Sequence, residues 1–265
     1  PEVIGVIKKV AEKGFSPSSL TNYIRNPIDF YYQKILNIKE YDDAEETVAA
    51  NTLGTVIHNT LEDFYSPLID KFLTIKHIKD MKLKVDKTVK HHFKSVYKEG
   101  DITKGKNLIV FEIAKRYISN FLDLEILDIE AGNQIKIKDI EADSSINLDI
   151  PELAFPIKIN GKVDRVDAYN GETRIIDYKT GKVLQNEVEI VNWEDITSDY
   201  KKYSKSFQIL TYALMMLESN QIQLPIEAGI ISFKNLKSGF LKFSQKDKVG
   251  AYAKKNTTIS IETID

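Results

Sequence analysis

Two carboxylates in the second half of the chain are predicted to face each other across a β-hairpin. Asn170-Gly171 stands between two strand patterns, and this dipeptide is the strongest short-range hairpin signal in the chain. With that turn, Asp164 lies directly opposite Asp177. Opposed side chains in antiparallel strands have Cβ atoms about 4.5–5.5 Å apart, and like charges there are destabilising. The pair therefore needs a proton or a cation, and a hard divalent ion that takes oxygen ligands would relieve the repulsion.

Lys179 adds a positive charge beside this pair. It lies two residues after Asp177, and residues i and i+2 share a face of a strand. A lysine next to two metal-binding carboxylates can position an attacking water and stabilise negative charge developing on phosphorus. The alternative is that one aspartate points to solvent at a strand end. The same register places Lys162 opposite Lys179, so that either the strands splay there or the acids neutralise both lysines.

The elements that must position these residues change type along the chain. Ser16-Pro17 and Asn26-Pro27 are helix-start signals, and apolar residues at helical spacing predict further helices over 52–65, 75–97 and 108–127. From Phe155 onward, alternating apolar residues predict the first strand of the hairpin. A second strand over 174–179, a buried helix over 206–217 and a strand over 226–233 complete the pattern. These elements predict a mixed α/β sheet flanked by helices, in a single domain spanning 1–265.

Composition narrows the class of protein. With 265 residues, of which 42% are hydrophobic and 29% charged, the chain reads as soluble and globular. No apolar run approaches the length of a membrane span. The absence of cysteine excludes disulfides, thiolate zinc sites and a cysteine nucleophile, and it fits the reducing cytoplasm. Because the chain begins with Pro1 rather than Met, we expect it to be part of a longer chain.

The net charge of −2 conceals an uneven distribution. The stretch 71–106 carries eleven lysines against four acids, a net charge of +7. Such a run is usually the solvated face of a helix. It is also what a protein uses to attract a nucleic acid backbone, so both interpretations remain open.

The motifs around the carboxylates resemble a known family. Segments 161–167 (GKVDRVD) and 175–181 (IIDYKTG) look like the core of the PD-(D/E)XK nuclease superfamily, in its RecB-like branch. Gly54-x-x-x-His58 resembles the first motif of that branch and Gln208-x-x-x-Tyr212 its last. The helix starts near residues 16 and 26 resemble the helical opening of the domain, so the match spans residues 15 to about 233.

This resemblance implies a restriction-endonuclease-like fold, with a helical N-terminal part at about 15–130 and a catalytic core at about 51–65 plus 135–235. It also implies a set of site residues. Mg²⁺ or Mn²⁺ would be held by His58, Asp164, Asp177 and the carbonyl of Tyr178, and Lys179 would orient the attacking water. Gln208 and Tyr212 would lie at the site and contact Lys179 or the nucleic acid strand.

The helical motifs also have ordinary structural interpretations. A lone histidine beside an apolar stripe is more often structural, and Gln208 and Tyr212 could merely satisfy buried backbone groups. Glu62, one turn after His58, is either a carboxylate partner of the imidazole or an ordinary surface acid. Many members of this branch carry four cysteines that hold an iron–sulfur cluster, and this cluster cannot form here because the chain has none.

As a function, the resemblance implies a divalent-metal-dependent deoxyribonuclease acting on DNA in repair or recombination, expected to be an exonuclease. Members of this branch often form the C-terminal domain of a helicase–nuclease, so a helicase subunit or a helicase-like region of the same chain is an expected partner. A competing hypothesis is a non-catalytic DNA-binding or scaffold module of such a complex. A third is an unrelated metal-binding α/β domain that matches by chance.

Overall fold

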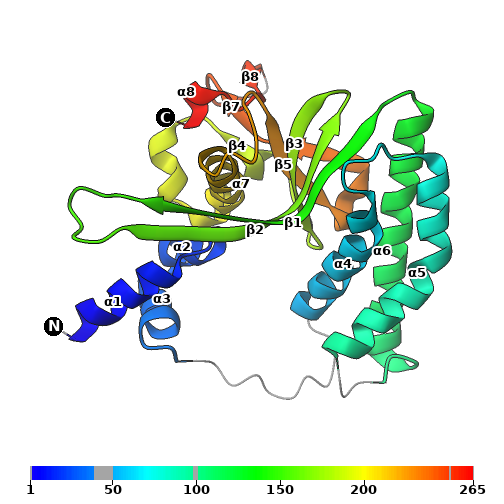
Figure 1. Ribbon diagram of the computed structural model, residues 1–265, viewed down its shortest axis with the longest axis horizontal. Helices are drawn as coiled ribbons and strands as arrows, with labels where there is room; N and C mark the ends of the chain where they lie inside the picture. Colours follow the sequence, from blue (N-terminus) through cyan, green and yellow to red (C-terminus); the bar gives the residue numbers. More distant parts are fainter. Residues whose placement is uncertain (1, 39–49, 98–100, 251, 265) are drawn as a thin grey trace.

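The computed structural model describes residues 2–38, 50–97, 101–250 and 252–264 (Figure 1). Pro1, and Lys98 and Glu99 of the lysine-rich stretch, lie outside the described residues. The helices of the first half are α1 (Glu2–Lys13), α2 (Pro17–Arg25), α3 (Pro27–Phe30), the π-helical turn η1 (Tyr31–Ile35), α4 (Ala50–Tyr65), η2 (Ser66–Leu68), α5 (Ile75–Val96) and α6 (Gly105–Glu130). The second half contains β1 (Ile135–Leu148), β2 (Ile157–Tyr169), β3 (Glu172–Lys179), η3 (Gln185–Val188), β4 (Glu189–Ile190), η4 (Trp193–Thr197), α7 (Tyr200–Glu218), β5 (Glu227–Ser232), η5 (Phe233–Ser238), β6 (Phe240–Lys242), β7 (Ser244–Lys246), β8 (Lys255–Asn256) and α8 (Ile261–Ile264).

Both predicted helix starts at the N-terminal end are confirmed. The Ser16 hydroxyl accepts a hydrogen bond from the backbone N–H of Ser19 at 3.1 Å, which caps α2. The Asn26 side chain accepts from the N–H of Ile28 at 3.0 Å and caps α3. In each case a proline occupies the first turn, where its missing N–H costs no hydrogen bond. The later helices α4, α5 and α6 also lie where the periodicity predicts them, whereas α1 is not among the predicted elements.

The main sheet has five strands in the order β1-β2-β3-β5-β6. Strands β3 and β5 are parallel and the other neighbours are antiparallel. Helix α7 connects the two parallel strands, as a parallel pair requires a crossover. The sheet lies between helices in Figure 1, with α7 to one side and α4 to α6 to the other. This arrangement confirms the predicted fold class, a mixed α/β sheet flanked by helices.

The hairpin of β2 and β3 has the predicted register. Tyr169 pairs with Glu172 and Asp167 pairs with Arg174 across the Asn170-Gly171 turn, where both turn residues have positive φ. The predicted start at Phe155 is wrong by two residues, because β2 begins at Ile157. Phe155 belongs to the loop that joins β2 to β1, a long strand that was not among the predicted elements.

The two hairpin strands separate beyond the pair Arg165–Ile176, which is the last paired position of β2 with β3. Just beyond this pair, a carboxylate oxygen of Asp164 accepts a hydrogen bond from the backbone N–H of Tyr178 at 2.6 Å. Lys162 instead lies opposite Asp143 of β1. The unfavourable lysine pair is therefore avoided because the strands splay, which was one of the two alternatives open from the sequence.

The sheet separates two hydrophobic cores. One is built by α4, α5 and α6 against residues such as Ile137, Ile176 and Tyr178. The other is built by α7 against residues such as Val163, Ile175 and Ile230. Adjacent β3 residues belong to different cores because successive side chains point to opposite faces of a strand. No helix in the described ranges is long and apolar enough to cross a membrane.

A buried network of charged groups joins the sheet to the first core. The Asp167 carboxylate, which is fully buried, accepts hydrogen bonds from Arg165 Nε at 2.8 Å and from Arg174 Nε at 2.8 Å. Arg165 also donates to Glu125 of α6 at 2.7 Å, and Glu125 accepts the hydroxyl of Tyr65 from α4. Each buried charge thus has an opposite charge beside it, as burial away from water requires. The network fixes β2 next to α4 and α6.

Candidate active site

The predicted site residues come from elements on both sides of the sheet. His58 lies on α4, Asp164 and Asp177 lie on β2 and β3, and Gln208 and Tyr212 lie on α7. The acids occupy the point where the hairpin strands separate, so their side chains are accessible to groups from both helices. The acids that the sequence predicts to bind a metal ion therefore lie at this splayed end of the hairpin.

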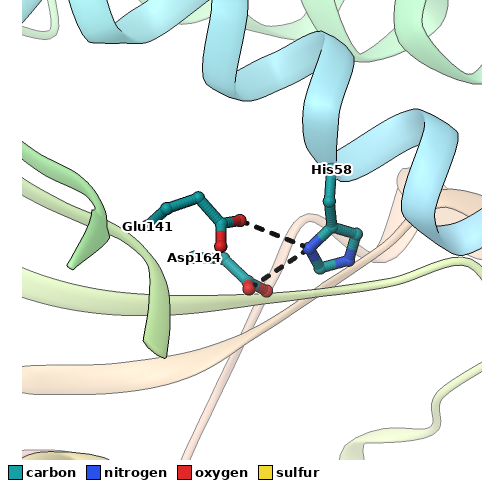
Figure 2. A group of neighbouring side chains, drawn as sticks. All are labelled: His58, Glu141 and Asp164. Carbon is teal, nitrogen blue, oxygen red and sulfur yellow. Dashed lines mark ion pairs between the residues drawn. The ribbon is translucent and has the colours of Figure 1, made fainter. Parts of the chain in front are cut away.

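One group of side chains at this point has the composition of a metal site. His58 Nδ1 lies 3.2 Å from Asp164 Oδ1 and 3.6 Å from Glu141 Oε1, as Figure 2 shows. One ligand atom from each of these three residues lies within 4.8 Å of the other two. Carboxylate oxygens with one imidazole are a donor set that divalent ions such as Mg²⁺ and Mn²⁺ accept. The residues therefore fit the cation that the motifs imply.

The protonation of His58 reflects the negative charge around it. Burial lowers the pKa of this imidazole, but hydrogen bonds to Asp164 and Glu141 and the charges of Asp164 and Asp177 outweigh burial and raise the pKa to about 10. A group of carboxylates that holds a proton this strongly is one that attracts positive charge. Residue types, spacing and charge all point to a cation site.

Glu141 is the member of this group that sequence reasoning missed. It lies in β1 between Ile140, which pairs with Arg165, and Ala142, which pairs with Val163. Its position is therefore opposite Asp164. The signal for β1 in the sequence is weak, because a register shift between Ile137 and Asp139 breaks the alternation of apolar residues. Glu62, the acid that the sequence offers as a partner of His58, has no ion pair or side-chain hydrogen bond with that imidazole in the described structure.

A second set of contacts surrounds Asp177. Its Oδ1 atom accepts hydrogen bonds from Lys179 Nζ and Gln208 Nε2, both at 3.0 Å. Gln208 also donates to the hydroxyl of Tyr212 at 2.8 Å. Oδ2 of Asp177 is buried and lies 2.9 Å from Lys179 Nζ, but it accepts no aligned hydrogen bond from any described residue. Both oxygens of this carboxylate therefore face the Lys179 ammonium, and Oδ1 is also held by Gln208.

The electrostatics of Asp177 and its neighbours follow from burial and from one another. Burial raises the pKa of Asp177, Lys179 lowers it and Asp164 raises it, with a net upward shift. Burial lowers the pKa of Lys179, but Asp177 more than compensates and the pKa is raised, so the ammonium stays charged. Burial and the charge of Asp177 raise the pKa of Tyr212, which keeps its hydroxyl protonated.

The structure thus brings together most of the predicted site residues. His58 contacts Asp164, and Lys179 and Gln208 both contact Asp177. Gln208 was expected to contact Lys179 or nucleic acid, and it donates to the carboxylate that Lys179 also contacts. For Tyr178, the backbone N–H is bound to Asp164, and the metal-binding role of its carbonyl stays a prediction.

The lysine-rich helix does not adjoin this site. Helix α5 packs against α4 and α6 and forms the outer edge of the helical layer in Figure 1. Lys82 is paired with Asp123, and Asp86 with Lys115 of α6. The remaining lysines of α5 are exposed to solvent: Lys76, Lys79, Lys84, Lys87, Lys90 and Lys94. Their placement fits the solvated helix face, and a role as a DNA-backbone contact stays a prediction.

Comparison with known proteins gives the family. A model of the PD-(D/E)XK nuclease superfamily matches residues 14–260. An uncharacterized protein of Rickettsia typhi is 26% identical over 228 residues, which cover 85% of this chain and 23% of the relative. An uncharacterized protein of Rickettsia conorii is 26% identical over 206 residues, covering 77% of this chain and 22% of the relative. The chain thus spans less than a quarter of the length of these relatives. Since the family model covers nearly the whole sequence and all the site residues, the chain belongs to the PD-(D/E)XK nuclease superfamily.

Proposed function

We propose that this chain is a divalent-metal-dependent deoxyribonuclease that hydrolyses phosphodiester bonds in DNA. The observation that carries the proposal is the convergence of His58, Asp164, Asp177 and Lys179 at one splayed strand end. Family membership supports the same reaction class. The site holds acids for a cation and a charged lysine, which are parts that metal-assisted hydrolysis of a phosphodiester needs.

Each residue has a role that its contacts suggest. His58, Asp164 and Asp177 would hold Mg²⁺ or Mn²⁺, which when bound polarises the phosphoryl oxygen and lowers the pKa of a bound water. Lys179, fixed against Asp177, orients the attacking water or stabilises the charge that develops on phosphorus. Gln208 holds the Asp177 carboxylate in place through a 3.0 Å hydrogen bond, and Tyr212 accepts from the same amide. These two are positioning residues in this proposal.

We further propose that the chain belongs to the RecB-like branch and acts as an exonuclease within a helicase–nuclease that repairs or recombines DNA. The order of motifs along the chain supports the branch, because the Gly54–His58 element precedes the hairpin and the Gln208–Tyr212 element follows it. The relatives carry the matching region within a much longer protein, which is compatible with a nuclease domain attached to other domains. A helicase partner and a cytoplasmic location are parts of this same proposal.

Incubation of the purified chain with end-labelled linear DNA tests the proposed activity. We expect cleavage of single- or double-stranded DNA with Mg²⁺ or Mn²⁺ and no cleavage when a chelator removes the ion. Release of mononucleotides from linear DNA, with circular DNA left intact, would support the exonuclease assignment. If the chain binds DNA in a salt-dependent way without cutting it under any of these conditions, the scaffold hypothesis replaces the nuclease.

A further inference from the structure

We infer that Asn235, together with Ser232, is a positioning residue for the proposed nuclease reaction, because it fixes the loop that follows Lys179. This loop comprises residues 180–183, and Lys179 is the last residue of β3. The inference rests on the proposed function, since it concerns the lysine to which that function assigns a role in the reaction. Neither Asn235 nor Ser232 belongs to the sequence motifs of the site.

Main-chain pairing of β3 with β5 ends at the position of the lysine. The last pair in this parallel ladder is Lys179 with Ser232, and η5 follows directly after β5. A loop that continues from a strand end has backbone N–H and C=O groups that still need partners, above all where the loop is buried. Val183, at the far end of loop 180–183, is buried. The loop therefore needs hydrogen-bond partners outside the main-chain ladder.

Two side chains supply these hydrogen bonds. The Asn235 amide binds both backbone groups of Val183: Oδ1 accepts the N–H at 3.1 Å, and Nδ2 donates to the carbonyl at 2.7 Å. The Ser232 hydroxyl lies 2.7 Å from the Gly181 carbonyl oxygen and also contacts Asn235 Oδ1, so that its one hydrogen is shared between two acceptors. An amide side chain offers a donor and an acceptor side by side, as a neighbouring strand does. Asn235 thus extends the contact between the two segments beyond the last main-chain pair.

The Asn235 side chain is itself held in one orientation. Nδ2 donates its second hydrogen to Ser238 Oγ at 3.1 Å, so each of the two polar atoms of the amide has two partners. The backbone of Asn235 departs from the helical geometry of η5, with φ −134° and ψ 49°. Because the amide is fixed by its own contacts, it can hold the loop without support from a neighbouring strand.

The loop also lies beside the helix that carries His58. A Cβ atom at Gly54, one turn before His58, would lie 4.0 Å from Thr180 Oγ1. Loop 180–183 therefore passes next to α4 at Thr180 and is bonded to η5 at Val183. Lys179 directly precedes this fixed segment.

A fixed loop limits where the Lys179 ammonium can lie. Nζ is 3.0 Å from Asp177 Oδ1, but the side chain is 32% exposed, so this contact does not enclose it. If the backbone of Lys179 separates from β5, the ammonium moves with it, and a displacement of about 1 Å can lower a reaction rate by about 100-fold. We therefore expect Asn235 to act on the chemical step through Lys179, and to leave the binding of metal and DNA unaffected.

Single-turnover cleavage of DNA tests this inference. Asn235→Ala should lower the rate by about 10–100-fold, while its affinities for Mn²⁺ and for DNA stay close to those of the wild type. Asn256→Ala is the matched control, because Asn256 is exposed and its side chain accepts only a local hydrogen bond, from the Thr258 N–H at 3.1 Å. This control should cleave like the wild type.

A double variant separates positioning of the lysine from a general loss of structure. Lys179→Ala combined with Asn235→Ala should cleave no more slowly than Lys179→Ala alone, because the loop acts through that lysine. Rate losses that multiply in the double variant would overturn the assignment. Wild-type cleavage by Asn235→Ala would overturn it as well.

Hydrogen exchange at the Val183 amide, followed by NMR without DNA, is a readout that does not depend on cleavage. Asn235→Ala removes the acceptor of this N–H and should speed its exchange by about tenfold or more. Asn235→Asp keeps an acceptor and loses the donor, so its exchange and cleavage rates should lie between those of the wild type and Asn235→Ala. It carries the same test if Asn235→Ala does not fold.

The outcomes distinguish this inference from the proposed function. Unchanged exchange at Val183 in folded Asn235→Ala would overturn the inference while cleavage by the wild type leaves the proposed nuclease intact. A wild type that cleaves no DNA would overturn the proposed function, and this inference with it.

Discussion

Lys179→Ala should lower the rate of DNA cleavage by about 10²–10³-fold, because it removes an ammonium that is fixed against the Asp177 carboxylate. The Lys179 ammonium is held 3.0 Å from Asp177 Oδ1 and keeps its charge, so it is preorganised for a water or a phosphoryl oxygen. Its loss should affect the chemical step more than substrate binding. Single-turnover kinetics with saturating DNA and Mg²⁺ would measure the effect directly.

Two controls separate this role in the reaction from a loss of the folded structure or of metal binding. Lys182→Ala removes an exposed lysine three residues later and should leave the cleavage rate unchanged. Lys179→Ala should retain Mn²⁺ binding within a few-fold, since the acids and His58 remain. A cleavage rate of Lys179→Ala close to that of the wild type would show that this lysine takes no part in the reaction.

Asp167→Ala should lower the free energy of unfolding by about 3–5 kcal/mol, the second large effect that we expect. Asp167 is fully buried and accepts hydrogen bonds from both Arg165 and Arg174. Its removal leaves two guanidinium groups without their shared carboxylate inside the protein, and an uncompensated buried charge is costly. Urea unfolding followed by circular dichroism would measure the change.

Asp167→Asn should lower the free energy of unfolding by less than Asp167→Ala does, because the amide oxygen can still accept one of the arginine hydrogen bonds. An exposed acid such as Asp143 gives the comparison, since its replacement by asparagine should change the free energy of unfolding by about 0.5 kcal/mol or less. If Asp167→Ala were as stable as Asp143→Asn, the buried network would not be holding β2 in place.

The sequence predicts the hairpin well because its signals are local. Asn170-Gly171 specifies a two-residue turn, and the turn sets the register as far as Arg165–Ile176, with Asp164 and Asp177 at the next position, where the strands separate. The helix starts at Ser16 and Asn26 are predicted for the same reason, since a capping side chain bonds to the backbone two or three residues away. These parts of the fold and site depend on neighbours in sequence.

The parts that sequence reasoning missed depend on distant neighbours. Glu141 reaches the site because β1 pairs with β2, and the irregular backbone of β1 hides its strand pattern. Glu125 looks like a surface acid on a helix, yet it is buried against Arg165, which lies forty residues later. Such contacts are decided by packing between elements, and local propensity carries no information about them.

Mg²⁺-dependent cleavage of end-labelled linear DNA by the wild type and by Asp177→Ala, purified in parallel, tests whether this site carries the nuclease activity. Asp177 contacts Lys179 and Gln208 and lies one position beyond the last hairpin pair, within the electrostatic influence of Asp164, so the proposed placement of both the metal ion and Lys179 depends on its carboxylate. We expect the wild type to cleave and the variant to lose cleavage by at least about 10³-fold, with its fold retained by circular dichroism. Equal cleavage by the two proteins would show that the activity resides outside this site.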